Sequence, residues 1–325
     1  MKIFVTGATG FVGSAVVKEL VGRGQEVTGL VRRRAMAGHV EEAGAKVLMG
    51  NLLDPAAWSQ AVKESDLVIS ASQPVRFGEH LAIPESHRRS YYHGKMVANL
   101  FLAAQDSRVK AIAVTYGALG FGNKGEQWVD GHTDLNPVGY ERSVTGAFWH
   151  IDKTSRKTKV PLLNVFTGWA YGPGNWCEAM ARGVANGTWR MAGPGDNFMS
   201  LIHIEDLASA YAQLAEKLPM GERMCLVDGN PVTQKELLGM VAGEVGCLPP
   251  KAVEVEEYAR ASGELAAESI SSSVRLSGDR MKKLLLPELK YPSCKEGIPS
   301  VIKALGIKKA ARRMEDEELK RAAGF

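Results

Sequence analysis

The sequence has few cysteines, few aromatic residues and little excess of charge of either sign. Its cysteines are widely scattered, with no paired spacing, so they suggest neither a zinc site nor a disulfide framework, and we predict no metal ligands. Lys and Arg total 40 against 36 Asp and Glu, a net charge of +4 that gives no reason to expect nucleic acid as a partner.

Long apolar runs and internal repeats are also missing. No run of apolar residues reaches the length of a transmembrane helix, and no cleavage-site pattern follows the apolar residues near the N-terminus. We therefore expect a cytoplasmic protein without a membrane partner. Hydrophobic residues make up 45% of the 325 positions, enough to bury a substantial core.

The first 34 residues predict a strand, a glycine-rich turn, a helix and a second strand. Lys2 to Thr6 is rich in β-branched and aromatic residues, and Gly7, Gly10 and Gly13 follow at three-residue spacing before a helical pattern. Val27 to Val31 supplies the second strand. This order, strand before the glycines and helix after them, is the context that a dinucleotide-binding turn requires.

Each glycine has a physical role in such a turn. Gly7 lets the chain reverse, Gly10 lets backbone N–H groups approach a pyrophosphate, and Gly13 lets the helix pack closely on the strand. The N-terminus of the helix then faces the anion. We therefore predict a dinucleotide cofactor at this turn.

The end of the second strand favours NADP over NAD. An acidic residue there would bind the ribose hydroxyls of NAD, but the chain has Arg32, Arg33 and Arg34 instead. Guanidinium groups suit the oxygens of a 2′-phosphate. A solvated basic loop is the alternative.

The rest of the first half alternates strands and helices. Polar residues 73–89 predict a loop, and Tyr91 to Gln105 a helix. Further strands are expected at 45–50, 66–72 and 109–115, with a helix beginning at Pro55. Alternation of this kind predicts an α/β fold, a doubly wound parallel sheet with helices on both faces. Ala71 and Ser72, at the end of a strand, are predicted to contact the cofactor.

Several motifs together resemble the extended short-chain dehydrogenase/reductases, a superfamily of nucleotide-sugar epimerases, dihydroflavonol-type reductases and hydroxysteroid dehydrogenases. The motifs are TGATGFVG at the start, GNLLD, YGPG from Tyr171, IHIEDLASAY from Ile202 and VDGNPVTQKELL from Val227. The resemblance covers nearly the whole chain. It implies a Rossmann domain over residues 1–170, to which later segments return, and a smaller substrate-binding lobe with a C-terminal helix over residues 171–325.

The resemblance also implies cofactor contacts and a partner. Thr9, Phe11 and Val12 would bind the cofactor within the glycine turn, and Asn51 and Leu52 would lie by the adenine. Family members often dimerise through the helix that carries the catalytic tyrosine, so a homodimer is expected. Val144, Phe148 and Ile151 suit either that interface or the core.

The catalytic residues depart from the family pattern. Members use a Ser or Thr, a Tyr, and a Lys four residues after the Tyr, which lowers the phenol pKa from about 10. Tyr140 lies at the tyrosine position, but Val144 replaces the lysine. The usual serine aligns with Tyr116, next to Thr115. We predict Tyr140 as the proton donor, also touching the cofactor, with Thr115 or Tyr116 assisting.

The expected substrate is small and rather apolar. Met199 stands where many nucleotide-sugar enzymes of the family carry an arginine, so a diphosphate would lose its clamp. Four aromatic residues are expected near the pocket: Phe121, Trp149, Trp169 and Trp176. Asp206 is predicted to cap a helix or to pair with its dipole. The charged C-terminal segment from residue 307 is predicted to form a surface helix or a frayed tail.

Three functions are consistent with these patterns. The first is an NADP-dependent oxidoreductase that acts on a small carbonyl or alcohol by hydride transfer. The second is an epimerase or dehydratase that recycles its cofactor internally. The third is a catalytically idle NADP-binding sensor or scaffold, which the missing lysine and serine would fit.

Overall fold

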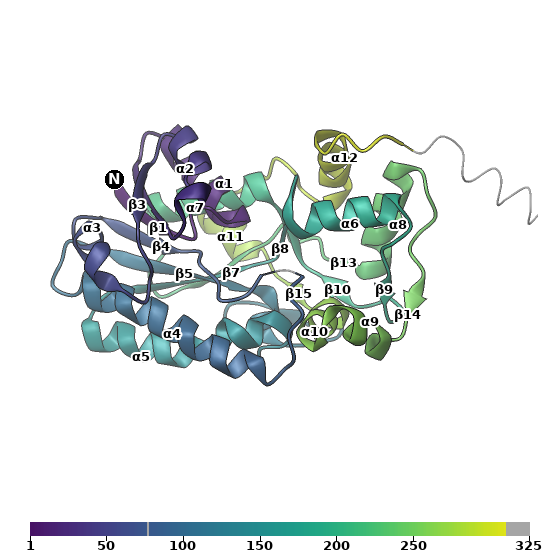
Figure 1. Ribbon diagram of the computed structural model, residues 1–325, viewed down its shortest axis with the longest axis horizontal. Helices are drawn as coiled ribbons and strands as arrows, with labels where there is room; N and C mark the ends of the chain where they lie inside the picture. The colour runs from purple at the N-terminus through teal and green to yellow at the C-terminus, as the bar shows by residue number, and fades with distance from the viewer. Residues whose placement is uncertain (77, 310–325) are drawn as a thin grey trace, which may run out of the picture.

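A seven-stranded parallel sheet lies at the centre of the computed structural model, which describes residues 1–76 and 78–309 (Figure 1). Its strands run in the order β12-β7-β5-β4-β1-β2-β3. Their bounds are β1 Lys2–Thr6, β2 Glu26–Val31, β3 Lys46–Met49, β4 Leu67–Ser70, β5 Ala111–Gly117, β7 Leu162–Thr167 and β12 Arg223–Leu226. The order reverses between β1 and β4, and ligands of doubly wound folds bind at this point of the carboxyl edge.

Helices cover both faces of the sheet, which confirms the predicted Rossmann-like α/β fold (Figure 1). One face carries α1 Phe11–Gly22, α2 Gly38–Glu42, α7 Ile204–Lys217 and α11 Asp279–Leu284. The other carries α3 Ser59–Lys63, α4 Glu85–Ala104 and α5 Phe148–Thr158. Side chains alternate between the two faces of the sheet along β1: Ile3 and Val5 pack in one core, and Phe4 packs in the other.

A third hydrophobic core lies beyond the end of the sheet. It is built mainly from α6 Asn175–Ala185, α8 Gln234–Val245 and α12 Cys294–Ala304. Beside these lie α9 Val255–Ser262 and α10 Glu264–Ser271, with the strand pairs β6 Trp128–Val129 and β15 Arg275–Leu276, β8 Trp169–Tyr171 and β11 Leu201–His203, β9 Met191–Ala192 and β14 Ala252–Val253, and β10 Phe198–Met199 and β13 Val232–Thr233. A domain boundary at residue 170 stays a prediction.

Short 3₁₀ turns join these elements: η1 Arg34–Met36, η2 Pro55–Ala57, η3 Ala118–Phe121, η4 Gly139–Ser143 and η5 Thr145–Ala147. Across residues 1–76 and 78–309 we find no helix that combines the length and the apolar character needed to cross a membrane. The predicted surface helix at the C-terminal end falls mostly on residues 310–325, outside the described residues.

The loop predicted over residues 73–89 is too long, because α4 begins at Glu85. The first turn of α4 resembles a loop in the sequence because its residues are mostly polar. Ser86, however, is buried and donates its hydroxyl to the Ile83 carbonyl oxygen at 2.6 Å. The Glu85 carboxylate accepts the backbone N–H of Ala82 at 2.8 Å. These contacts start the helix six residues before the predicted Tyr91.

Tyr140 does not lie on an α-helix, contrary to the prediction. It belongs to η4, and α5 begins only at Phe148. The backbone N–H of Gly139 donates to Glu268 at 2.7 Å, and that of Tyr140 to the Ser269 hydroxyl at 2.9 Å. Both acceptors belong to α10. Because these N–H groups bond to another element, the turn is fixed in place without a longer helix.

Asp206 does not cap its own helix. His203 is the N-cap of α7, where its ring Nδ1 accepts the backbone N–H of Glu205 at 3.3 Å. The Asp206 carboxylate instead accepts the backbone N–H groups of Lys290, at 2.7 Å, and Tyr291, at 2.9 Å. Asp206 therefore ties the segment before α12 to the start of α7.

Substituting Gly13 should destabilise the fold more than substituting another glycine of α1. A Cβ at Gly13 would overlap the carbonyl oxygen of Gly7, whereas one at Gly22 would meet nothing within 4 Å. We expect Gly13→Ala to lower the free energy of unfolding by roughly 1 to 3 kcal/mol. Gly22→Ala should be neutral or raise it by up to about 1 kcal/mol. Urea denaturation measures both, and equal stabilities would contradict the predicted overlap.

Asp228 should make stability depend on pH. It is 1% exposed, and its Oδ2 has no hydrogen-bond partner in the described part of the chain. Burial raises the pKa of this carboxyl from 3.8 to about 7, although the Asn230 N–H and Lys282 act in the opposite direction. The folded state thus holds the proton more tightly than the unfolded chain. Its contribution to stability is complete below about pH 4 and is lost as pH rises through about 7.

We expect Asp228→Asn to remove this loss, because the amide oxygen can still accept the Asn230 N–H and carries no charge. Between about pH 5 and pH 8 the wild type should lose roughly 1 to 3 kcal/mol more than the variant. Urea denaturation at both pH values provides the comparison. Parallel pH profiles for the two proteins would show that Asp228 does not titrate in this range.

Candidate functional site

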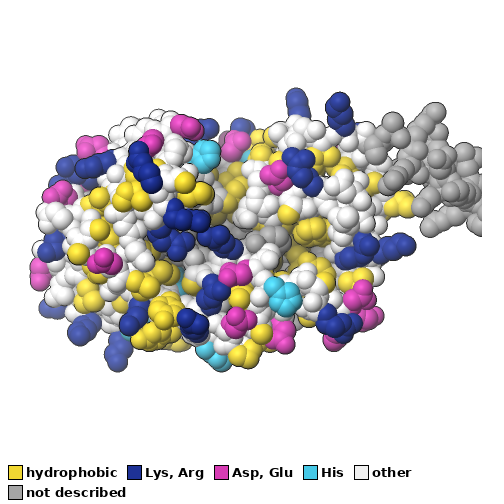
Figure 2. Space-filling view, in the orientation of Figure 1, with side chains coloured by type: hydrophobic (Ala, Val, Ile, Leu, Met, Phe, Trp, Pro, Cys, Tyr) yellow, Lys and Arg dark blue, Asp and Glu magenta, His cyan; other side chains and the backbone are white. Residues whose placement is uncertain are grey.

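A cleft of about 1520 Å³ opens at the carboxyl edge of the sheet, between the glycine turn, η4 and the start of α6. Figure 2 shows Lys and Arg side chains gathered around this hollow. Every residue predicted to bind a cofactor lines it: Gly7, Thr9, Gly10, Phe11, Val12, Gly13, Arg32, Arg33, Asn51, Leu52, Ala71, Ser72 and Tyr140. The structure thus brings the predicted residues together in one cleft from five separate segments of the chain.

The glycine turn is packed too closely for side chains. Gly7 has φ +71°, and a Cβ there would lie 2.7 Å from the carbonyl carbon of Ala71 at the end of β4. The Gly10 N–H donates to the Gly7 carbonyl oxygen at 2.8 Å and closes the turn. The N-terminus of α1 faces the cleft, because Phe11, Val12 and Gly13 line it. A dinucleotide pyrophosphate fits these features.

Two of the three arginines after β2 face the cleft. Arg32 and Arg33 line it, whereas Arg34 pairs with Glu41 at 2.8 Å and is not part of the lining. Both lining arginines are exposed. Their guanidinium groups are therefore free to meet an anionic ligand.

The predicted adenine site is held by two side chains that the sequence did not single out. The Trp58 ring N–H donates to the Asn51 carbonyl oxygen at 2.8 Å. The Asn99 side-chain amide donates to the Leu52 carbonyl oxygen at 2.8 Å. These bonds join the loop at Asn51 and Leu52 to Trp58, directly before α3, and to α4, so the position of this end of the cleft depends on the helix layer that contains α3 and α4.

Tyr140 lines the cleft, but among the described residues no cation acidifies it. Its hydroxyl donates to the backbone oxygen of Glu79 at 2.9 Å. Burial, together with the neighbouring Tyr258 and Glu79, raises the phenol pKa to about 12. Val144, at the position of the missing lysine, is fully buried in the core. Residue 144 therefore supplies no positive charge in place of the lysine ammonium group.

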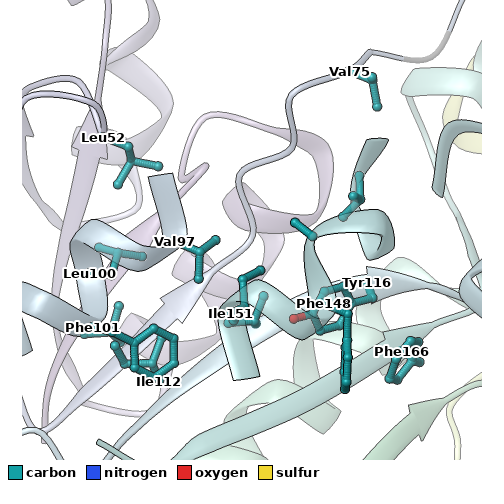
Figure 3. Packing of buried hydrophobic residues seen from close by; sticks show 14 of the residues in the cluster. Leu52, Val75, Val97, Leu100, Phe101, Ile112, Tyr116, Phe148, Ile151 and Phe166 are labelled. Carbon is teal, nitrogen blue, oxygen red and sulfur yellow. The ribbon is translucent and has the colours of Figure 1, made fainter. Parts of the chain in front are cut away.

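Thr115 and Tyr116 point to opposite faces of the sheet, because side chains alternate along β5. Thr115 lines the cleft, and its hydroxyl is 2.5 Å from that of Tyr211 on α7. Tyr116 is fully buried among Phe148 and Phe166, at ring distances of 5.6 and 5.1 Å (Figure 3). The predicted role of Tyr116 beside the substrate therefore needs correction, since its side chain is not part of the cleft lining.

Only two of the four expected aromatic residues line the cleft. Trp169 and Trp176 do so, with their rings 5.4 Å apart and nearly perpendicular. Phe121 is fully buried in the core, and Trp149 is 66% exposed on α5, so neither belongs to the pocket. Met199 is buried in the third core. The two tryptophans give the substrate end of the cleft an apolar wall.

Glu141 is a buried acidic lining residue that sequence reasoning missed. It follows Tyr140 directly and is 7% exposed. Its carboxylate accepts the Thr145 hydroxyl at 2.5 Å. Burial raises the carboxyl pKa, against hydrogen bonds from Thr145 and the backbone of Gly117. A glutamate in a polar stretch carries no sequence signal for burial, because this residue type is usually exposed.

The fold and cleft together define a dinucleotide-binding α/β protein of the doubly wound class. A model of the NAD dependent epimerase/dehydratase family matches residues 3–225. The chain belongs to this NAD(P)-dependent family, whose members related to it include reductases and epimerases.

Two curated relatives are similar over most of the chain. A 2-alkyl-3-oxoalkanoate reductase of Shewanella oneidensis is 26% identical over 271 residues, covering 76% of this chain and 66% of the relative. A 4-hydroxy-2-methyl-3-oxo-4-farnesyl-3,4-dihydroquinoline-1-oxide ketoreductase of Stigmatella aurantiaca is 24% identical over 305 residues, covering 90% and 84%. The chain matches only part of the length of several curated relatives. In four of them, one of which is the Shewanella enzyme, the matched region covers 23% to 66% of the relative.

A solved structure has the same fold. The human epimerase family protein SDR39U1 (isoform 2), crystallised with NADPH, has a TM-score of 0.75. It is 16% identical, and the alignment covers 93% of this chain and 99% of that one.

Proposed function

We propose that this chain is an NADP-dependent oxidoreductase that interconverts a small, rather apolar carbonyl compound and its alcohol. The observation that carries the proposal is the cleft itself, which joins an intact glycine turn, the exposed Arg32 and Arg33, and the apolar wall of Trp169 and Trp176. The two relatives whose names describe ketone reduction support a carbonyl substrate.

The residues of the cleft would divide the work of binding. A bound nicotinamide cofactor supplies or accepts the hydride. The turn from Gly7 to Gly13 would hold its pyrophosphate, and Arg32 and Arg33 would hold the 2′-phosphate through charge-assisted hydrogen bonds. Ala71 and Ser72 lie where their backbone closes the same part of the cleft.

Tyr140 would contact the substrate oxygen. Its hydroxyl would turn from the Glu79 carbonyl oxygen to the substrate and donate a hydrogen bond there. Thr115, fixed by Tyr211, would support the position of the reacting atoms from the sheet side. Orientation of this kind places the substrate carbon for hydride transfer.

Cofactor selectivity should depend on the two lining arginines. We expect the double variant Arg32→Ala/Arg33→Ala to weaken NADPH binding by about 10- to 100-fold, because hydrogen bonds to a charged phosphate are lost. NADH binding should change little. Arg34→Ala is the matched control, since Arg34 pairs with Glu41 outside the lining. Calorimetry gives the affinities, and equal losses for the two cofactors would contradict the proposed phosphate site.

Removing the Tyr140 hydroxyl should slow turnover. We expect Tyr140→Phe to lower kcat for NADPH oxidation with small 3-oxo esters by about 10-fold or more, because the hydroxyl that would contact the substrate oxygen is lost. Tyr91→Phe is the control, because Tyr91 is an exposed tyrosine on α4. An unchanged kcat would remove Tyr140 from the reaction. Wild-type protein that binds NADPH but turns over no carbonyl or alcohol would support the idle binding protein instead.

The homodimer and the cytoplasmic location stay predictions. Val144, Phe148 and Ile151 are buried in the core of the chain itself, so they are not available to a second subunit. The outer face of α5 instead exposes Trp149. Tyr140 lies on η4 and not on α5, so a contact between subunits through α5 would not involve Tyr140 directly.

A further inference from the structure

The cleft holds one buried carboxyl group that the proposed reaction has not used. Resting on that proposed function, we propose that Glu141 is the catalytic residue that gives a proton to the substrate oxygen during reduction and takes it back during oxidation. Its place in the cleft, next to Tyr140 and at the end of β5, is the observation from which the proposal starts.

The backbone at the end of β5 makes room for this carboxyl group. Gly117 has φ −97°, an ordinary value, so its conformation does not require glycine. A Cβ at Gly117 would lie 2.6 Å from Oε1 of Glu141 and 3.0 Å from its carboxyl carbon. Residue 117 is therefore a glycine because the Glu141 carboxyl group occupies the space that a side chain would need.

A second glycine makes room for the partner of Glu141. A Cβ at Gly120 would lie 2.7 Å from the hydroxyl oxygen of Thr145. That hydroxyl donates to Oε2 of Glu141 at 2.5 Å. Gly117 and Gly120 thus leave space for a Glu141–Thr145 pair, which fixes the carboxyl group at the wall of the cleft.

The turn that carries Glu141 is held from outside the cleft. Arg142 pairs with Glu268 on α10 at 2.5 Å, and Ser269 accepts the Tyr140 N–H. These contacts secure η4 without using the Glu141 carboxyl group. The attachment of η4 to α10 therefore does not depend on the Glu141 carboxyl group.

The groups around Glu141 leave it without a cation that would hold it ionised. Tyr140 on its own turn and Tyr116 on β5 are phenols with raised pKa. His93 on α4 is buried, donates its ring Nδ1–H to the Val144 carbonyl oxygen, and has its pKa lowered by burial to about 4. Arg142 is engaged by Glu268. Burial then favours the protonated carboxyl group.

The proton balance is simple. In reduction, a hydride from the nicotinamide cofactor forms the new C–H bond and the C=O double bond becomes a C–O single bond. The O–H bond of Glu141 breaks and a new O–H bond forms on the substrate. Solvent then reprotonates the carboxylate. In oxidation each transfer reverses, so the carboxylate form is the one required.

The decisive experiment compares full-length wild type with Glu141→Gln. The amide keeps an oxygen that can accept from Thr145 but carries no titratable proton. We expect calorimetric NADPH affinity within about 2-fold and kcat for reduction of ethyl acetoacetate lowered by about 100-fold or more. Wild-type kcat for reduction should fall as pH rises through the pKa of Glu141, whereas the residual rate of the variant should not.

Two further variants separate this role from loosening of the turn. Gly117→Ala keeps Glu141 but pushes its carboxyl group aside, so it should also lose turnover. Glu268→Gln weakens the hold on Arg142 and should lower stability without changing the pH profile. Infrared spectroscopy of the proteins without cofactor should show the C=O band of a protonated carboxyl that shifts in D₂O and is missing from Glu141→Gln.

The outcomes are distinguishable. Wild-type turnover matched by Glu141→Gln would overturn the role of Glu141 and leave the proposed function standing. An infrared spectrum in which Glu141 is ionised throughout the active pH range would also overturn it. Wild-type protein without any NADPH oxidation, across carbonyl substrates, would instead remove the proposed function, and the role of Glu141 with it.

Discussion

The close approach of the glycine turn to the end of β4 is the contact on which the cleft depends. Gly7 lies against Ala71, and Gly13 lies against the carbonyl oxygen of Gly7, at distances that exclude any Cβ. These contacts bring the N-terminus of α1 to the point where the strand order reverses. Without them the helix would stand away from the sheet, and neither the arginines after β2 nor the backbone of residues 71–72 would share one cavity.

Sequence reasoning predicted the parts of the fold that depend on local pattern. The first strand, the glycine turn and the following helix lie as expected, because β-branched residues and glycine spacing act within a few residues. The same reasoning missed the start of α4 and the true setting of Tyr140. Both depend on distant contacts, since the N–H groups of Gly139 and Tyr140 bond to α10, about 129 residues later in the chain.

The site shows the same division. Arg32 and Arg33 could be predicted to lie at the cleft because they directly follow a recognisable strand. The face on which Thr115 and Tyr116 lie depends on the strand's exact register, and the structure turns Tyr116 into the aromatic core. Glu141 could not be predicted as a site residue from the sequence, because its carboxyl group occupies the space beside Gly117, which belongs to another element, β5.

A single labelling experiment tests the central claim, which is hydride transfer from NADPH to a carbonyl carbon in this cleft. The wild-type protein is incubated with ethyl acetoacetate and NADPH that carries deuterium on both positions of the nicotinamide C4, and the product is examined by mass spectrometry and NMR. The account predicts a 3-hydroxy ester with one deuterium on the carbinol carbon. Product without deuterium at that carbon, or no product from any of a panel of small 3-oxo esters, would contradict it.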